Sequence, residues 1–173
     1  MCRTFLTVGG MPMPDELGER GETPRFVDVG DSTSLVVRRW GRGGLEVEWS
    51  QTAFGLRSHS GGTLSHAQLD RAEMLRGFEG IATKLCAIPL YGYRWRKGDE
   101  WSRVPAGWAL GAFDPASGFL LFSAGDVSPM LIVAGWPDAR RWLLSETWEQ
   151  MRLLRGIADD MDGSRLVEAR RAS

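Results

Sequence analysis

Short apolar and alternating runs, separated by polar and glycine-rich segments, recur along most of this chain. Runs of this length that are rich in valine and aromatic residues are typical of β-strands. The pattern predicts strands at residues 3–8, 25–29, 34–40, 45–49, 85–90, 91–96, 106–113, 119–123 and 130–133. It predicts loops or turns at residues 9–24, 41–44, 51–62, 98–104 and 114–118, and Pro89 is expected to end its strand.

Apolar residues at helical spacing predict three helices. The clearest one begins at Ser65, a candidate N-cap, and continues to Ala82, and the others cover residues 137–144 and 147–157. A turn of helix is expected at residues 15–17, and the charged tail, residues 158–173, is expected to fray. These elements predict an α+β fold with a curved, mostly antiparallel β core and about three flanking helices, in a single domain over residues 1–173.

The composition narrows the class of protein only a little. Of 173 residues, 25% are charged and 43% are hydrophobic, and the net charge is −1, which is ordinary for a soluble globular protein. The overall charge does not indicate a nucleic-acid-binding protein, but it leaves room for a local basic patch. The two cysteines suggest neither a disulfide framework nor a zinc site, so no metal or cofactor is expected. With no long apolar run and no signal peptide, we expect a cytoplasmic monomer that does not enter a membrane.

The second residue carries the most distinctive chemistry. A small residue after the initiator methionine normally permits removal of that methionine, and Cys2 would then carry a free α-amine beside its thiol. The pKa of an α-amine is about 7.7–8.0 and that of a thiol is about 8.5, so both groups have reactive forms near neutral pH. Such a 1,2-aminothiol can close a thiazolidine ring with an aldehyde, or act as an N-terminal nucleophile with its own amine as base. The alternative is that Cys2 is only a small residue at a frayed terminus.

Several short motifs resemble those of one family. The chain opens with Met1-Cys2-Arg3, residues 24–26 read Pro-Arg-Phe, and residues 85–95 read Leu-Cys-Ala-Ile-Pro-Leu-Tyr-Gly-Tyr-Arg-Trp. Later, Asp126 precedes an apolar segment and a helix whose residues 139–143 read Ala-Arg-Arg-Trp-Leu. In this order of motifs, over most of its length, the chain resembles the SOS response-associated peptidase (SRAP) family, whose members sense abasic sites in single-stranded DNA.

The resemblance implies a role for Cys2. In this family, autocatalytic removal of methionine frees the N-terminal cysteine, which reacts with the ring-opened aldehyde of an abasic deoxyribose and forms a thiazolidine DNA–protein crosslink. The family's supporting groups include an Asn and an Arg in a loop, a Glu before the hallmark Trp, and a His followed by Asp. In this chain Arg57 and Asp126 match, but Arg94 replaces the Glu and Gly125 replaces the His. General acid–base catalysis contributes about 10²–10⁴ in rate, so we expect slower crosslinking than the family's full set of groups allows.

The other candidate site residues are mostly arginines. Guanidinium groups bind phosphates bidentately, so the expected DNA contacts are Arg3, Arg38, Arg39, Arg57 and Arg94. His59 lies in the loop with Arg57 and is a candidate proton shuttle, although a loop histidine often has no task. Arg57 and Arg94 have the alternative of being ordinary surface charges. Residues expected only to pack or to have no task are Cys86, His66, Trp40, Trp95, Trp142 and Trp148.

Two other functions remain open. The first is a pseudoenzyme, in which the same fold binds DNA or protein non-covalently, because the family's acid and base are missing. The second is an N-terminal-nucleophile amidohydrolase, which also begins at a processed cysteine. Glutaminase-type members of that class usually follow the cysteine with Gly and Ile, whereas Arg3 and Thr4 stand here.

Overall fold

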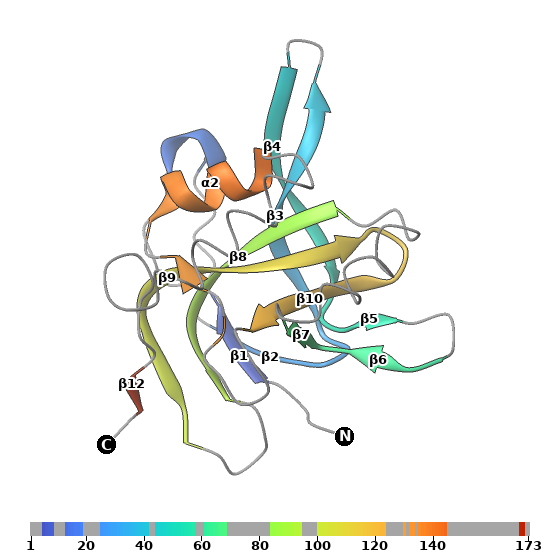
Figure 1. The fold of residues 1–173 in the computed structure, drawn as a ribbon, viewed down its shortest axis with the longest axis vertical. Helices are drawn as coiled ribbons and strands as arrows, with labels where there is room; N and C mark the ends of the chain where they lie inside the picture. The colour runs from blue at the N-terminus through green and yellow to red at the C-terminus, as the bar shows by residue number, and fades with distance from the viewer. Residues whose placement is uncertain are drawn as a thin grey trace.

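Most of the described structure is β-sheet (Figure 1). The computed structural model describes residues 5–8, 13–18, 25–41, 44–57, 61–68, 84–94, 100–123, 130, 132–133, 135–144 and 170–171, and all statements below concern these residues. The strands are β1 (Phe5–Val8), β2 (Arg25–Asp28), β3 (Ser32–Gly41), β4 (Gly44–Ala53), β5 (Leu56–Arg57), β6 (Thr63–Leu64), β7 (His66–Gln68), β8 (Lys84–Arg94), β9 (Ser102–Asp114), β10 (Gly118–Ser123), β11 (Ile132–Val133) and β12 (Arg170–Arg171). The helical elements are the 3₁₀ turn η1 (Asp15–Leu17) and the α-helix α2 (Trp136–Leu144).

The two longest strands, β8 and β9, organise the main sheet. Its central path runs β2-β1-β8-β9-β10-β7, while β3 joins β8 and carries β4, and β11 and β12 join β9. Among these pairings only that of β7 with β10 is parallel, so the sheet is mixed but mostly antiparallel. Figure 1 shows that the long strands bend strongly. The predicted curved, mostly antiparallel core is therefore confirmed.

Pro89 lies inside β8 and does not end it, which corrects the prediction of two separate strands. On one side, β8 pairs with β3 through Cys86 and Ala87, and then with β1 from Leu90 onward. Pro89 falls between these two stretches, while its other side pairs with β9. A proline removes one backbone N–H donor, and the change of neighbouring strand is a place where that donor is not needed for pairing. The strand therefore continues to Arg94, with a bulge between Leu90 and Gly92.

Both faces of the central sheet are buried, in two separate clusters. Residues at successive positions of a strand point to opposite faces. On β8, accordingly, Ala87 belongs to the first cluster, and Cys86 and Ile88 belong to the second. The first cluster lies under α2 and includes Trp108, Phe122 and Trp142. The second contains side chains from β2, β3, β8, β9, β10 and β11 and none from α2, so the sheet itself curves around it.

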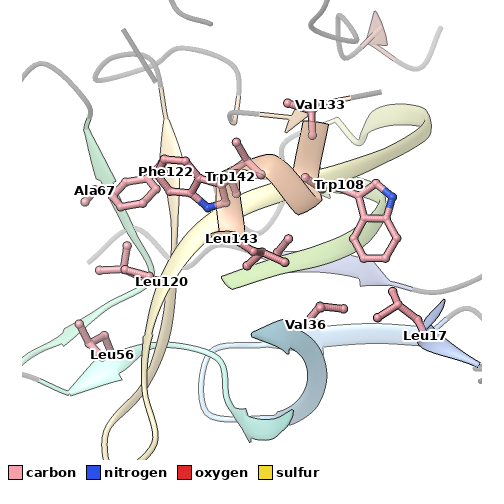
Figure 2. Close-up of a cluster of buried hydrophobic side chains, with 14 residues drawn as sticks. Leu17, Val36, Leu56, Ala67, Trp108, Leu120, Phe122, Val133, Trp142 and Leu143 are labelled. Atoms are coloured by element: carbon pink, nitrogen blue, oxygen red, sulfur yellow. The ribbon is translucent and has the colours of Figure 1, made fainter. Parts of the chain in front are cut away.

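Helix α2 covers the first cluster with its apolar face (Figure 2). Trp142 is only 1% exposed; its ring meets that of Phe122 edge-on at 6.0 Å, and its indole N–H donates to the Cys86 carbonyl at 3.3 Å. On the outer side, the Glu16 carboxylate in η1 accepts hydrogen bonds from Trp136 and from Arg140. The prediction of a helix at residues 137–144 and of a turn of helix at 15–17 is confirmed.

The expected three flanking helices are not found in the described residues, where α2 is the single α-helix. The helix predicted from Ser65 is wrong at its start, because His66–Gln68 form β7, which pairs with Leu121–Ser123 of β10. Ser65 is buried, and its carbonyl accepts the Leu121 N–H at 3.1 Å. Pairing with a distant strand has overridden the local capping signal. Residues 69–83 and the helix predicted at 147–157 lie outside the described residues.

Two predicted loops are partly strand. In the segment 51–62, β4 continues to Ala53, and Leu56–Arg57 form β5, which pairs with β6. The polar end of β4 is compatible with a strand because β4 pairs only with β3 in the part of the chain described here. In the segment 98–104, β9 begins at Ser102. Within the charged tail, Arg170–Arg171 form β12, which pairs with β9.

Gly111 on β9 leaves no room for a side chain against β10. A Cβ atom at this position would lie 2.1 Å from the Leu120 carbonyl oxygen and 3.2 Å from the Cys86 sulfur. The first neighbour is backbone of a buried strand and cannot move aside cheaply. Gly111→Ala is expected to lower the free energy of unfolding by about 1–3 kcal/mol, as overpacking in a core does. Urea denaturation compares it with Gly62→Ala, whose Cβ meets nothing within 4 Å; equal stability of the two variants would contradict this packing.

Candidate functional site

The first described strand, β1, lies in the interior of the sheet, between β2 and β8. Phe5 pairs with Arg94 on one side and with Asp28 on the other. Positions directly opposite in an antiparallel pair have Cα atoms about 4.5–5.5 Å apart. Phe5 is therefore held beside Arg94, the last residue of β8.

Beside this end of β8 lies a cluster of Arg94, Trp101 and Phe26, called here the aromatic–arginine cluster. The Arg94 guanidinium carbon is 4.9 Å from the centroid of the Trp101 ring, which is a cation–π geometry. The Trp101 and Phe26 ring centroids are 5.4 Å apart, with the planes inclined at 50°. Phe26 remains 74% exposed despite this contact, and Arg94 and Trp101 are half-buried. The cluster thus presents the Phe26 ring to solvent, beside a half-buried arginine.

The strand register extends from this cluster across the sheet. It joins Phe26 to Thr7, Thr7 to Gly92, Gly92 to Arg103 and Arg103 to Arg170, in one row of Cα positions across five strands. Gly92, in the middle of this row, is buried, so the exposed surface at Phe26 does not continue past it.

Arg38 and Arg39 lie elsewhere, on the hairpin of β3 and β4. Beyond Val37, β3 pairs only with β4, and in Figure 1 this hairpin is at the top, whereas β8 ends at the bottom. Arg39 forms exposed ion pairs with Glu46 at 2.7 Å and Glu48 at 3.3 Å. The hydrogen bond to Glu46, and then the charge of Glu48, raise the pKa of Arg39. These carboxylates offset the positive charge of Arg39. The structure does not bring Arg39 together with Arg94.

Arg57 is also separate from the aromatic–arginine cluster. Its backbone N–H donates to the Ser117 carbonyl at 3.1 Å, which places β5 beside the turn between β9 and β10. That turn is at the end of the ladder where Phe113 pairs with Lys84, whereas Arg94 lies at the other end. Asp114 holds the turn by accepting bonds from the Ala116 N–H and the Ser117 hydroxyl. The side chain of Arg57 is exposed.

Several predicted site residues lie outside the described residues, namely Cys2, Arg3, His59 and Asp126. Their roles stay predictions. His66 is described and lies on β7, not in the first turn of a helix; its Nδ1 is 3.3 Å from the Ser65 hydroxyl. The sequence interpretation missed Phe26 and Trp101. The available signal was an aromatic residue next to Arg25 and another seven residues after Arg94, but nothing in the pattern indicates that the two rings meet.

Cys86 is the buried cysteine that the sequence predicts. It is 0% exposed, and burial raises the pKa of its thiol far above the ordinary range. The thiolate is the reactive form, so this thiol should not react in the folded protein. In a Cys2→Ala variant, where Cys86 is the sole thiol, we expect an aromatic disulfide reagent at pH 8 to label nothing until denaturant is added. Rapid labelling of the folded variant would contradict the buried position.

Comparisons with known proteins add no identification. Models of known protein families do not match the chain, and no curated protein sequence matches it. Over the described ranges, no helix is both long and apolar enough to cross a membrane. The same ranges contain no group of three or more His, Cys, Asp or Glu residues that could hold a metal ion.

Proposed function

We propose that this protein binds abasic sites in single-stranded DNA and crosslinks to them through Cys2 after Met1 is removed. The observation that carries the proposal is the place of β1, which begins three residues after Cys2 and pairs directly with Arg94. Three residues span at most about 11 Å, so the terminal aminothiol stays tethered near that end of β8. A cation and two aromatic rings are present there. These are the groups that bind a phosphate backbone and unstacked bases.

The proposed reaction needs no group beyond the aminothiol and the sugar aldehyde. The Cys2 amine attacks C1′ of the ring-opened deoxyribose, and the resulting carbinolamine loses water to give an imine. The Cys2 sulfur then adds to the imine carbon, and its proton passes to the nitrogen, which closes the five-membered thiazolidine. One C–N bond and one C–S bond form, and one water molecule leaves. Tethering the two reactants favours both additions, because effective molarities for well-oriented groups are large.

Arg94 changes the expected rate of ring closure and the charge beside the Cys2 thiol. A carboxylate at this position would assist loss of water from the carbinolamine, and its replacement removes a contribution of about 10²–10⁴ in rate. An arginine instead places a fixed positive charge beside the tethered terminus. Positive charge near a thiol favours the thiolate, and it also attracts the phosphate next to the lesion. We therefore expect the protein to bind DNA tightly and to close the thiazolidine ring slowly.

The test is a mass measurement followed by a crosslinking assay. The intact mass of the purified protein shows whether Met1 is absent. The protein is then incubated with an abasic single-stranded oligonucleotide, and a denaturing gel with mass analysis should show a species equal to protein plus oligonucleotide minus one water. Protein that lacks Met1 and still gives no such species would overturn the proposal.

A non-covalent DNA-binding module is the second candidate, and the replacement of the family's Glu by Arg94 is the observation that favours it. Retention of Met1 in the purified protein would support this candidate, because a blocked amine cannot form the ring. The protein then binds intact and abasic oligonucleotides equally, and binding reverses with salt. An N-terminal-nucleophile amidohydrolase would instead release ammonia from a simple amide.

A further inference from the structure

We infer that the aromatic–arginine cluster of Phe26, Trp101 and Arg94 is a base-stacking subsite for an unpaired nucleotide of single-stranded DNA. The inference rests on the proposed function for the identity of the ligand, but it concerns non-covalent binding of undamaged bases rather than the reaction at Cys2. It assigns specific side chains to the recognition of the strand that flanks a lesion.

The geometry of the cluster fits a flat, uncharged ring. Phe26 is 74% exposed, and the half-buried Trp101 ring contacts it with 5.4 Å between the two ring centroids. Arg94, at 4.9 Å from the Trp101 ring, holds that ring in place through a cation–π contact. Every nucleobase has a π-face, and stacking on aromatic side chains is the usual way to bind unpaired bases without reading their sequence. Duplex DNA cannot offer such a face, because its bases are already stacked.

The charge in the cluster favours nucleic acid over an apolar protein segment. The Arg94 guanidinium lies 4.9 Å from the Trp101 ring, so a cation lies beside the exposed Phe26 ring. A nucleotide whose base stacks on an aromatic ring brings a phosphate with it, and a guanidinium suits a phosphate. An apolar protein segment carries no such charge.

The experiment measures binding of a fluorescent oligothymidine without an abasic site to the full-length protein, by anisotropy at low salt. We expect Phe26→Ala to weaken binding from about five-fold to about a hundred-fold, the range for losing one stacked base. Phe26→Trp should retain affinity, whereas Phe26→Leu, which keeps an apolar side chain but no π-face, should bind as poorly as Phe26→Ala. Arg140→Ala, at an exposed position of α2, is the matched surface control and should bind like the wild type.

A second measurement reports stacking directly. Bases quench tryptophan fluorescence on stacking, so the oligonucleotide should quench part of the wild-type emission, and Trp101→Phe should lose that part. Thermal unfolding confirms that this variant is folded. Any one of four results would overturn the subsite. They are wild-type affinity in Phe26→Ala, no binding by the wild type, binding of a duplex as tight as that of the single strand, and displacement of the probe by polyglutamate as effective as by unlabelled oligothymidine. The last result would show a surface that reads only negative charge, as in an acidic protein partner.

The outcomes for the subsite and for the proposed function are separable. Loss of oligothymidine binding in Phe26→Ala, together with a wild type that never crosslinks abasic DNA, supports the subsite and defeats the crosslinking proposal. Unchanged oligothymidine binding in Phe26→Ala, with efficient crosslinking by the wild type, defeats the subsite and supports the crosslinking proposal.

Discussion

Replacement of Cys2 by serine is expected to abolish the thiazolidine crosslink to abasic single-stranded DNA. The serine variant keeps a free α-amine once Met1 is removed, so it can form the imine but has no sulfur to close the ring. Imines hydrolyse, and the adduct should disappear on a denaturing gel while the wild-type adduct remains. The measurement is the fraction of labelled oligonucleotide that is shifted as a function of time. Reduction with borohydride should trap the variant's imine and restore a band.

The matched control for this substitution is Cys86→Ala. Cys86 is fully buried on β8, and its carbonyl, not its thiol, receives the Trp142 hydrogen bond. Alanine at this position should therefore leave crosslinking at the wild-type level. Binding of an undamaged oligonucleotide should be equal in both variants, because neither change touches the aromatic–arginine cluster. A Cys2→Ser protein that still forms a stable adduct without borohydride would contradict the assignment of the sulfur.

Replacement of Trp142 by alanine is expected to have the largest effect on stability. The indole is 1% exposed and is packed against Phe122 in the cluster under α2 (Figure 2). Tryptophan-to-alanine changes in a core cost about 3–5 kcal/mol through lost burial and the cavity that remains. Domains are stable by only about 5–15 kcal/mol, so the variant should unfold at much lower urea concentration.

Trp142→Phe separates the two contributions of this side chain. Phenylalanine keeps most of the apolar contact but removes the N–H that donates to the Cys86 carbonyl at 3.3 Å. Losing that hydrogen bond should cost about 1 kcal/mol, with a further loss from the smaller ring. If Trp142→Ala were as stable as the wild type in urea, then α2 would not be packed against the sheet as described.

The sequence predicts many elements of the fold correctly, because at those elements the local pattern and the tertiary pairing agree. The apolar run at residues 119–123 becomes β10, and the helical spacing at 137–144 becomes α2. Where they disagree, the pattern fails. Ser65 has the chemistry of a helix cap, yet the next residue pairs with Leu121 in a parallel ladder that no local rule can anticipate. Pro89 breaks most strands, but here β8 changes partner at that residue.

The candidate site is predicted less well, because a surface depends on register between distant segments. The sequence identifies Arg94 as a candidate and identifies the chemistry of Cys2. It groups Arg94 with Arg39, which the structure places on a different hairpin with carboxylates beside it. Phe26 and Trp101 meet only because β2, β1, β8 and β9 are neighbours in the sheet. Composition and spacing contain no information about that order.

The interior position of β1 has a consequence for the timing of maturation during synthesis. The second neighbour of β1 is β8, which ends at Arg94. Arg94 leaves the ribosome 89 residues after Phe5. At about 5–20 residues per second, the nascent terminus waits roughly 4–18 s before that partner exists. During this interval β1 lacks one of its two neighbouring strands, so the proposed removal of Met1 can precede closure of the sheet around β1.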